Sequence, residues 1–397
     1  YSSGVSLTCN LVVETYNVWG LAFFSKRKES RIKKLGHLLA SSTADIVALQ
    51  EVWVLADARL LARAAADGGR LLYSFKFRSG VFGPGLMILS RFMIVSASFY
   101  PFEVAGDPTN VTQGDFFASK GIGWARLKLP SGHGTRGRDF VDVLVTHTHA
   151  NYGMRYAPIS DAAATGPLHG TDGHGGPLVP EDAEAGFRVS NVLQLGRLAG
   201  ALASGAGAAV VVAGDLNAHP GTLELALLRC LAPQLADAWA SAGGRRLGWT
   251  CNDPANSWTK ARSPPPVRID YILSTMPAES FRVVDRRSRA GMSLSDHCAV
   301  EATLLCGRAE VGARLTGDDV GAGLPENLRR RVRTHYGLCA RGASMGHSAP
   351  MSSGESAAPP RLPSLSAPPC LSDLLCRRGR RLFGRPPPAR WRSRSGH

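Results

Sequence analysis

The chain has 397 residues, and 44% of them are hydrophobic, which excludes collagen-like and wholly disordered proteins. Its 46 basic and 31 acidic residues give a formal net charge of +15. Sixteen arginines and six acidic residues come after Cys306, so residues 1–306 keep a net charge of only +5, which argues against a protein that must neutralise many nucleic-acid phosphates.

Short apolar runs alternate with longer amphipathic segments through residues 1–306, and this alternation predicts a single α/β sandwich domain. In chain order, the predicted strands are residues 7–16, 46–50, 86–89, 140–146, 210–213, 269–273 and 299–305. The predicted helices are residues 26–39, 57–66, 187–202 and 222–230.

Two segments follow neither the strand period nor the helix period. Residues 152–184 are rich in Gly, Pro and Ala, and we expect a disordered insert or a lid there. Residues 307–397 are rich in Arg and Pro and lack the apolar surface that folding requires, so we expect a disordered tail. The folded catalytic domain is therefore predicted to end near Cys306.

The cysteines and the apolar runs indicate where the protein works. Eight scattered cysteines without a CxxC pair fit a reducing, intracellular compartment. No apolar run reaches the roughly 18 residues of a membrane span, so we expect a soluble or peripheral protein, although a chain that begins at Tyr1 leaves its true N-terminus unknown. The basic outer face of the helix around residues 26–34 is either a solvated surface or a docking face for anionic lipid.

Polar side chains follow or begin six of the strands. They are Asn17, Glu51, His147, Asp215 with Asn217, Asp270, and Asp296 with His297. Each has a structural interpretation on its own, as a turn residue, a helix cap or a hydrogen-bonded histidine. Strand edges of a layered α/β fold converge on one crevice, however, and oxygen ligands with two histidines suit a Mg²⁺-assisted attack on a phosphoryl centre.

Within this set, Glu51 with Asn17 beside it is the candidate Mg²⁺ site, because hard cations prefer oxygen ligands. His297 is the candidate general base, and Asp270 is the expected acceptor for its other ring N–H. Asp215 and Asn217 are two residues apart and are expected on one side of an extended chain, where one can orient water and the other can donate to the phosphoryl oxygens.

Six short motifs resemble, in order, those of the exonuclease-endonuclease-phosphatase superfamily. They are residues 17–20, 49–53, 145–150, 214–217, 268–272 and 294–297. Within the superfamily the chain resembles the neutral sphingomyelinases, because residues 77–86 (FRSGVFGPGL) and 114–121 (GDFFASKG) are similar to segments of those enzymes. Residues 248–258 are more loosely similar to the fungal inositolphosphosphingolipid phospholipases C.

The resemblance implies a DNase-I-like fold, a four-layer α/β sandwich of two packed sheets flanked by helices. It also implies Mg²⁺-dependent, phospholipase C-type hydrolysis of sphingomyelin or a related sphingophospholipid to ceramide and a phosphorylated head group. It assigns metal binding to Glu51, prefers His147 to His149 as a catalytic residue, and places Asp115 and Lys120 on a loop that acts on the leaving group or substrate.

Two other function classes remain open at this point. An abasic-site-type endonuclease shares the Arg-x-Asp-Tyr and Gly-Asp-Leu-Asn motifs, although the small charge of residues 1–306 leads us to expect no nucleic-acid partner. A catalytically inactive lipid-binding module is the alternative from a different class. No obligate protein partner is inferred.

Overall fold

The computed structural model describes residues 10–22, 25–80, 83–106, 115, 118–130, 140–151, 184–205, 208–244, 248–261 and 263–306. The predicted insert, apart from Glu184, and the predicted tail lie outside these residues. The strands are β1 (Asn10–Asn17), β2 (Ile46–Gln50), β3 (Tyr73–Lys76), β4 (Met87–Ser90), β5 (Met93–Pro101), β6 (Gly121–Lys128), β7 (Phe140–His147), β8 (Val210–Asp215), β9 (Ala236–Asp237), β10 (Asp270–Ser274), β11 (Ala278–Val284) and β12 (Ala299–Leu305). The helices are α1 (Lys28–Ala40), α2 (Leu55–Asp67), α3 (Ala185–Ala203), α4 (Leu223–Leu231) and α5 (Ala238–Ser241).

Every predicted strand and helix is present, with boundaries that differ by a few residues. The structure adds elements that the sequence patterns did not predict: β3, β5, β6, β9, β11 and α5. These additions complete two six-stranded sheets. Sheet A has the order β11-β12-β1-β2-β4-β3, and sheet B has the order β5-β6-β7-β8-β10-β9.

Both sheets are mixed, and each has its parallel pair at the centre. In sheet A, β1 runs parallel to β2 and antiparallel to β12. In sheet B, β7 runs parallel to β8, which is antiparallel to β10. A parallel pair requires a crossover connection, and here α1 links β1 to β2 while α3 lies between β7 and β8.

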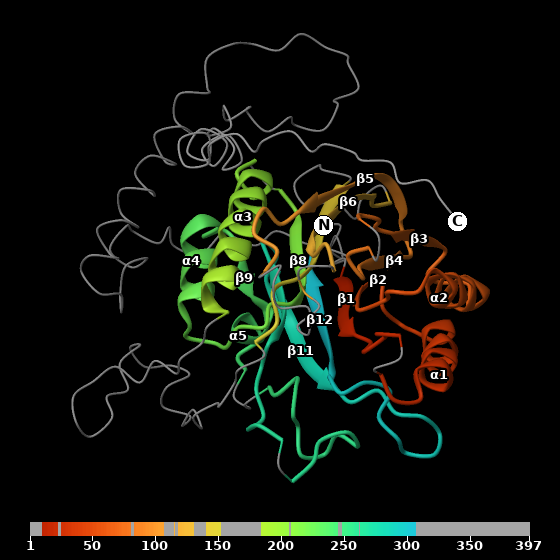
Figure 1. Ribbon diagram of the computed structural model, residues 1–397. Coiled ribbons are helices and arrows are strands. Elements are labelled where there is room, and N and C mark those ends of the chain that lie inside the picture. Colours follow the sequence, from red (N-terminus) through yellow and green to blue (C-terminus); the bar gives the residue numbers. More distant parts are fainter. Residues whose placement is uncertain are drawn as a thin grey trace, which may run out of the picture. The chain divides into compact units, whose positions relative to one another are not determined.

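The layers follow from the alternation of side chains along each strand. Ile46 and Ala48 of β2 point to the core between the two sheets, whereas Val47 and Leu49 pack against the residues of α1 and α2. Sheet B repeats this arrangement, with its outer face packed on α3 and α4. Figure 1 shows the resulting order of helices, sheet, sheet and helices. The predicted four-layer α/β sandwich is therefore confirmed.

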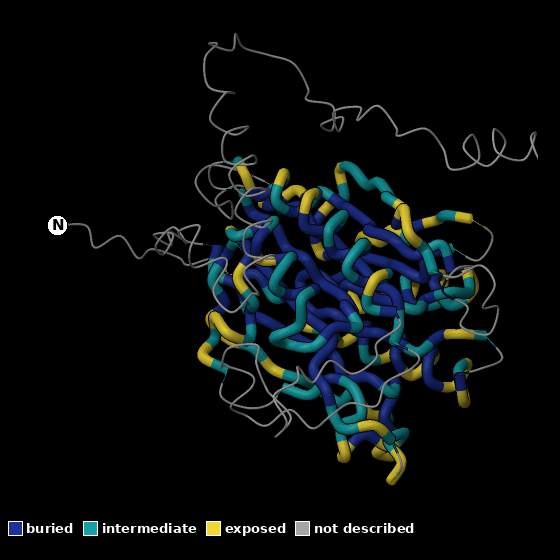
Figure 2. The backbone as a smooth tube through the Cα atoms, turned by 60° about the vertical axis from the view of Figure 1, so that its left-hand side comes forward, coloured by how far each residue is buried: buried dark blue, intermediate teal, exposed yellow. Residues whose placement is uncertain are grey.

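Burial is concentrated in the strands of both sheets, which form the dark centre of Figure 2. All five residues of β2 and all six of β8 are buried. Runs that are buried on both faces are typical of central parallel strands, which explains why these two were predictable from continuous apolar sequence. In the part of the chain that the structure describes, no helix has the length and apolar character that crossing a membrane requires.

Candidate active site

The central strands of both sheets deliver their polar termini to one place. Asn17 is the last residue of β1, and Glu51 comes directly after β2. In sheet B, Asp215 at the end of β8 lies opposite His147 of β7 on one side and Asp270 of β10 on the other. The strand pairing alone therefore surrounds Asp215 with two of the predicted site residues.

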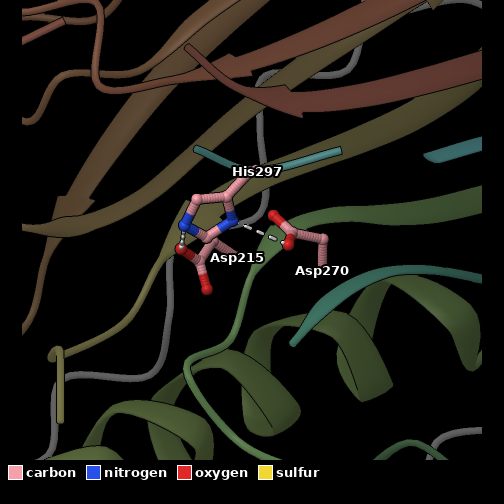
Figure 3. Close-up of side chains that lie close together, drawn as sticks. All are labelled: Asp215, Asp270 and His297. Carbon is pink, nitrogen blue, oxygen red and sulfur yellow. Dashed lines mark hydrogen bonds and ion pairs between the residues drawn. The ribbon is translucent and has the colours of Figure 1, made fainter. Parts of the chain in front are cut away.

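His297 lies between two carboxylates, as Figure 3 shows. Its Nδ1 is 2.9 Å from Asp270 Oδ2, so the ring donates a hydrogen bond to that carboxylate. Its Nε2 is 3.9 Å from Asp215 Oδ2. One ligand atom from each of the three residues lies within 4.8 Å of the others, so the cluster has the size of a cation site as well as that of a base with its orienting acid.

The pKa of His297 reflects these neighbours. Burial disfavours the charged ring, but the Asp270 carboxylate and the Cys251 side chain outweigh it and raise the pKa of His297 well above its ordinary value. The Asp270 carboxylate also fixes the tautomer, because a carboxylate can only accept from Nδ1. Nε2 is left as the atom that exchanges a proton with water or substrate.

Asn17 joins the two sheets at the site. Its Nδ2 donates to Glu51 Oε1 and to Asp215 Oδ2, both at 3.1 Å, and its Oδ1 accepts from the Trp19 backbone N–H at 3.0 Å. The predicted ligand pair of Asn17 and Glu51 therefore lies together. In this arrangement Asn17 presents its amide nitrogen, rather than its oxygen, to the carboxylates.

Burial raises the pKa values of the acidic groups at the site. Burial raises the pKa of Asp215 to about 7, and the Asp270 charge adds to this effect. Burial also raises the pKa of Glu51, with a further contribution from the Asp296 charge, and it raises the pKa of Asp296. Asp270 Oδ1 is buried and has no hydrogen-bond partner among the described residues. A set of buried and half-buried carboxylate oxygens with elevated pKa values fits a divalent cation such as Mg²⁺.

The backbone at this site adopts a conformation that is uncommon for residues with side chains. Glu51, Trp19 and Asn217 have φ values of 59°, 50° and 44°. Such left-handed residues are strained and cluster at functional sites. Gly20 allows the Glu51 loop to approach, because a Cβ at Gly20 would lie 2.2 Å from the Glu51 carbonyl oxygen.

Lys120 and Asp115, the loop residues expected at the site, lie together on its other side. Lys120 Nζ is 2.6 Å from Asp115 Oδ1 and donates to the Thr148 carbonyl at 2.9 Å. The same ammonium lies 3.2 Å from His147 Nε2. Asp115 Oδ2 accepts from the Ala150 backbone N–H at 2.7 Å. Asp115 and Lys120 are thereby fastened to the residues that follow β7.

His147 is a neutral acceptor in this arrangement. Burial, followed by the Lys120 charge, lowers the pKa of His147 well below its ordinary value. Because Lys120 donates to Nε2, the ring proton is on Nδ1. Nε2 also lies 3.6 Å from Asp215 Oδ2. His149 is placed differently: its ring stacks on Phe187 at 4.7 Å.

Asn217 lies near Asp215, but the expected reason was wrong. The chain is not extended here, because Asn217 has a left-handed backbone and its N–H donates to Asp215 Oδ1 at 2.9 Å. This side-chain turn sends the Asn217 amide to the Thr148 carbonyl at 3.2 Å. The turn, rather than strand alternation, brings the two residues together.

Sequence reasoning gave no separate role to two residues that the structure places at the site. Asp296, next to His297, raises the pKa of Glu51 and is half-buried. Ser295 donates from Oγ to the Asn17 carbonyl at 2.7 Å and to Asp296 Oδ1 at 3.2 Å. The signal for Asp296 was its position in the same strand-end motif. Nothing in the sequence pattern indicated the contact of Ser295.

Comparison with known proteins places this geometry in context. The sequence model described as "Endonuclease/Exonuclease/phosphatase family" matches residues 15–297. The inositol phosphosphingolipids phospholipase C of Schizosaccharomyces pombe is 29% identical over 323 residues, covering 74% of this chain and 68% of that protein. Human sphingomyelin phosphodiesterase 2 is 27% identical over 313 residues, covering 75% of this chain and 65% of that protein.

Solved structures show the same fold. Sphingomyelinase C from Streptomyces griseocarneus aligns with a TM-score of 0.52 at 20% identity, covering 75% of this chain and 100% of the other. TDP2 from C. elegans aligns with a TM-score of 0.52 at 19% identity, covering 75% of each chain. At this level of identity the likeness concerns the fold alone.

Proposed function

This chain belongs to the endonuclease/exonuclease/phosphatase family and is a phosphoric diester hydrolase; from that premise we propose that it hydrolyses a sphingophospholipid to ceramide and a phosphorylated head group. The two curated relatives act, by name, on inositol phosphosphingolipids and on sphingomyelin. They differ in head group and share the sphingolipid, so the substrate class proposed here is the sphingophospholipid.

One observation carries the proposal: the His297–Asp270 pair at 2.9 Å faces Asp215, beside the Asn17–Glu51 pair. Such a pair can hold a base in one tautomer next to a phosphoryl centre. His297 takes the proton of the attacking water at Nε2. Asp215 and Asn217 orient that water and contact the phosphoryl oxygens.

The remaining residues carry charge and protons. Glu51, with Asn17 beside it, would hold Mg²⁺, which supplies a Lewis acid for the phosphate oxygens when bound. The Lys120 ammonium, with the neutral His147 ring beside it, supplies positive charge where charge develops on the equatorial oxygens. Asp115, whose carboxylate pairs with the Lys120 ammonium, is assigned to help protonate the leaving alkoxide, with that ammonium as the proton source.

A lipid panel tests the proposal. We expect the full chain to release phosphorylated head group from sphingomyelin or inositolphosphoceramide in Mg²⁺-supplemented mixed micelles, and EDTA to abolish the release. His297→Ala should lower kcat by about 100-fold or more, the usual contribution of a positioned base. Glu51→Gln should also lower kcat, because it removes the carboxylate of the candidate metal site. Glu279→Gln, an exposed change on β11, is the matched control.

Three results would contradict the proposal. Wild-type turnover in either site variant excludes the assigned roles. Nicking of abasic duplex faster than any lipid hydrolysis favours the endonuclease. Binding of lipid vesicles without turnover in Mg²⁺ favours the inactive lipid-binding module.

We also propose peripheral contact with anionic lipid through the start of α1. Lys26, Arg27, Lys33 and Lys34 are exposed there, and Leu21, in the loop that follows Asn17, is 42% exposed. Each basic residue near an anionic surface contributes about 1 kcal/mol. This surface adjoins the loop that carries Asn17, so docking would bring the lipid phosphate toward the candidate site.

A further inference from the structure

A buried arginine lies behind the candidate site without a carboxylate among its hydrogen-bond partners in the described residues. Arg31 is on the first turn of α1 and is 2% exposed. Arg31 lies within the basic run of residues 26–34, but unlike the exposed lysines of that run its side chain turns inward. Burying a guanidinium is costly unless its N–H groups are satisfied.

Four backbone carbonyls satisfy it. Nε donates to Lys26 O at 2.8 Å, and NH1 donates to Val18 O at 2.9 Å and to Leu294 O at 2.7 Å. NH2 donates to Trp19 O at 2.6 Å. Four of the five N–H groups of the guanidinium are thus used on main chain from three separate segments.

Two of these segments carry the candidate site. Val18 and Trp19 come directly after Asn17, and Leu294 comes directly before the run that holds Asp296 and His297. NH1 spans the two loops by itself, since it donates to Val18 and to Leu294. Arg31 therefore links the residues after Asn17 to the loop before His297, in addition to the Ser295 hydrogen bond to the Asn17 carbonyl.

Two tryptophans fix the plane of the guanidinium. It lies 4.6 Å from the Trp19 ring centre and 5.9 Å from that of Trp258, and the two rings meet edge to face at 5.1 Å. Trp258 Nε1 donates to the Ser293 carbonyl at 2.9 Å, which adds a further contact to the same loop. A flat, delocalised cation suits this position, and a lysine ammonium does not.

We propose that Arg31 is a positioning residue that holds the Asn17–Glu51 loops in register with the Asp296–His297 loop. Its charge also lies where it acts on the Glu51 and Asp296 carboxylates. The inference rests on the proposed function, since it takes Glu51 as the metal-site residue and His297 as the base. Removal of Arg31 should therefore weaken metal binding and loosen both loops, while the rest of the sandwich stays folded.

The test uses the full chain and two readouts that need no lipid. Arg31→Met removes the donors, and Arg31→Lys keeps the charge with fewer reachable carbonyls. Titration calorimetry with Mg²⁺ should give a Kd about 10-fold weaker for Arg31→Met, as for other groups that orient ligands, and an intermediate Kd for Arg31→Lys. Hydrogen exchange should be at least about 10-fold faster in peptides covering residues 17–22 and 292–298.

Arg63→Met and Arg63→Lys, on the exposed face of α2, are the matched controls and should change neither readout. The proposal is overturned by a folded Arg31 variant with wild-type Mg²⁺ affinity and wild-type exchange in both loops. Loss of protection across both sheets, or failure of both variants to fold, also overturns it, because that is the signature of a purely structural arginine. A wild-type chain that binds Mg²⁺ but hydrolyses no sphingophospholipid contradicts the proposed function and leaves this test intact.

Discussion

The ring of His297 donates from Nδ1 to the Asp270 carboxylate at 2.9 Å. This hydrogen bond joins the first residue of β10 in sheet B to the loop that leads into β12 in sheet A. It fixes the ring tautomer and, with the Cys251 side chain, raises the pKa of His297. The pH dependence of activity should report this pair.

Asp270→Asn should move the acidic limb of kcat/KM to lower pH. A general base must lose its proton before it works, and the Asp270 charge delays that loss to higher pH, so removing the charge allows deprotonation earlier. The plateau should fall by about 100-fold or more, because the tautomer is no longer held by a carboxylate. A pH–rate profile of each variant measures both effects. Asp67→Asn at the exposed end of α2 is the control, and an unmoved limb in Asp270→Asn would contradict the prediction.

Mg²⁺ should stabilise the fold more at pH 7.5 than at pH 5. Burial raises the pKa of Asp215 to about 7 and also raises those of Glu51 and Asp296. Between the unfolded and folded pKa values these groups bind more protons in the folded state, so without metal their contribution to stability falls as pH rises. A bound cation stabilises the charged carboxylates and competes with protons for them.

Thermal unfolding with and without MgCl₂ at the two pH values measures this difference. At 100 times its Kd, Mg²⁺ contributes about 2.7 kcal/mol. Glu51→Gln should lose most of the pH 7.5 shift, whereas Glu279→Gln should keep it. An equal or larger shift at pH 5 would be incompatible with the carboxylate assignment.

Gly20→Ala should reduce activity more than it reduces folded protein. The new Cβ would lie 2.2 Å from the Glu51 carbonyl oxygen, and a contact that short forces the backbone to move. Overpacking of this kind costs about 1–3 kcal/mol, and here the displaced backbone belongs to the candidate metal ligand. Gly186→Ala, where no atom of the described residues lies within 4 Å, is the control. Activity per folded molecule and melting temperature should separate the two variants; equal specific activity would argue against a role for this close approach.

Charge reversal at the start of α1 should weaken vesicle binding. Lys26→Glu with Arg27→Glu should lower co-sedimentation with phosphatidylserine-containing vesicles by at least about 10-fold, with a smaller effect in 0.5 M salt because exposed charges are screened. Arg59→Glu with Arg63→Glu makes the same change in charge on the exposed face of α2. Equal losses in the two double variants would indicate a general charge effect rather than docking through α1.

The strands that could be predicted were those whose burial gives a continuous apolar run in the sequence. Residues 46–50 and 210–213 are continuous apolar runs, and both form central strands. β3 was missed because most of its residues are exposed, and hydrogen bonds to β4 hold it in the sheet. β6 was missed for a different reason: it contains Gly123, where a Cβ would lie 2.6 Å from the Phe77 ring. Neither the strand pairing of β3 nor the close packing of Gly123 against Phe77 can be seen in a local sequence pattern.

The candidate site could also be predicted only in part. The strand ends predicted which residues meet. Asn17 contacts Glu51 and Asp215, and His297 lies beside Asp270 and Asp215. The sequence did not predict how they are held. The Asn217 turn and the inward orientation of Arg31 depend on contacts between residues far apart in the chain, which no local pattern contains.

The two sheets draw on the chain unequally. Sheet B is built from one continuous stretch, β5 to β10, whereas sheet A takes β1 to β4 from the start of the domain and β11 and β12 from its end. During synthesis the middle stretch therefore has all of its strands before sheet A can close. Because β12 pairs directly with β1 and follows His297, the catalytic constellation is completed last. In a nascent chain the candidate site would therefore stay incomplete until β12, the last strand among the described residues, has left the ribosome.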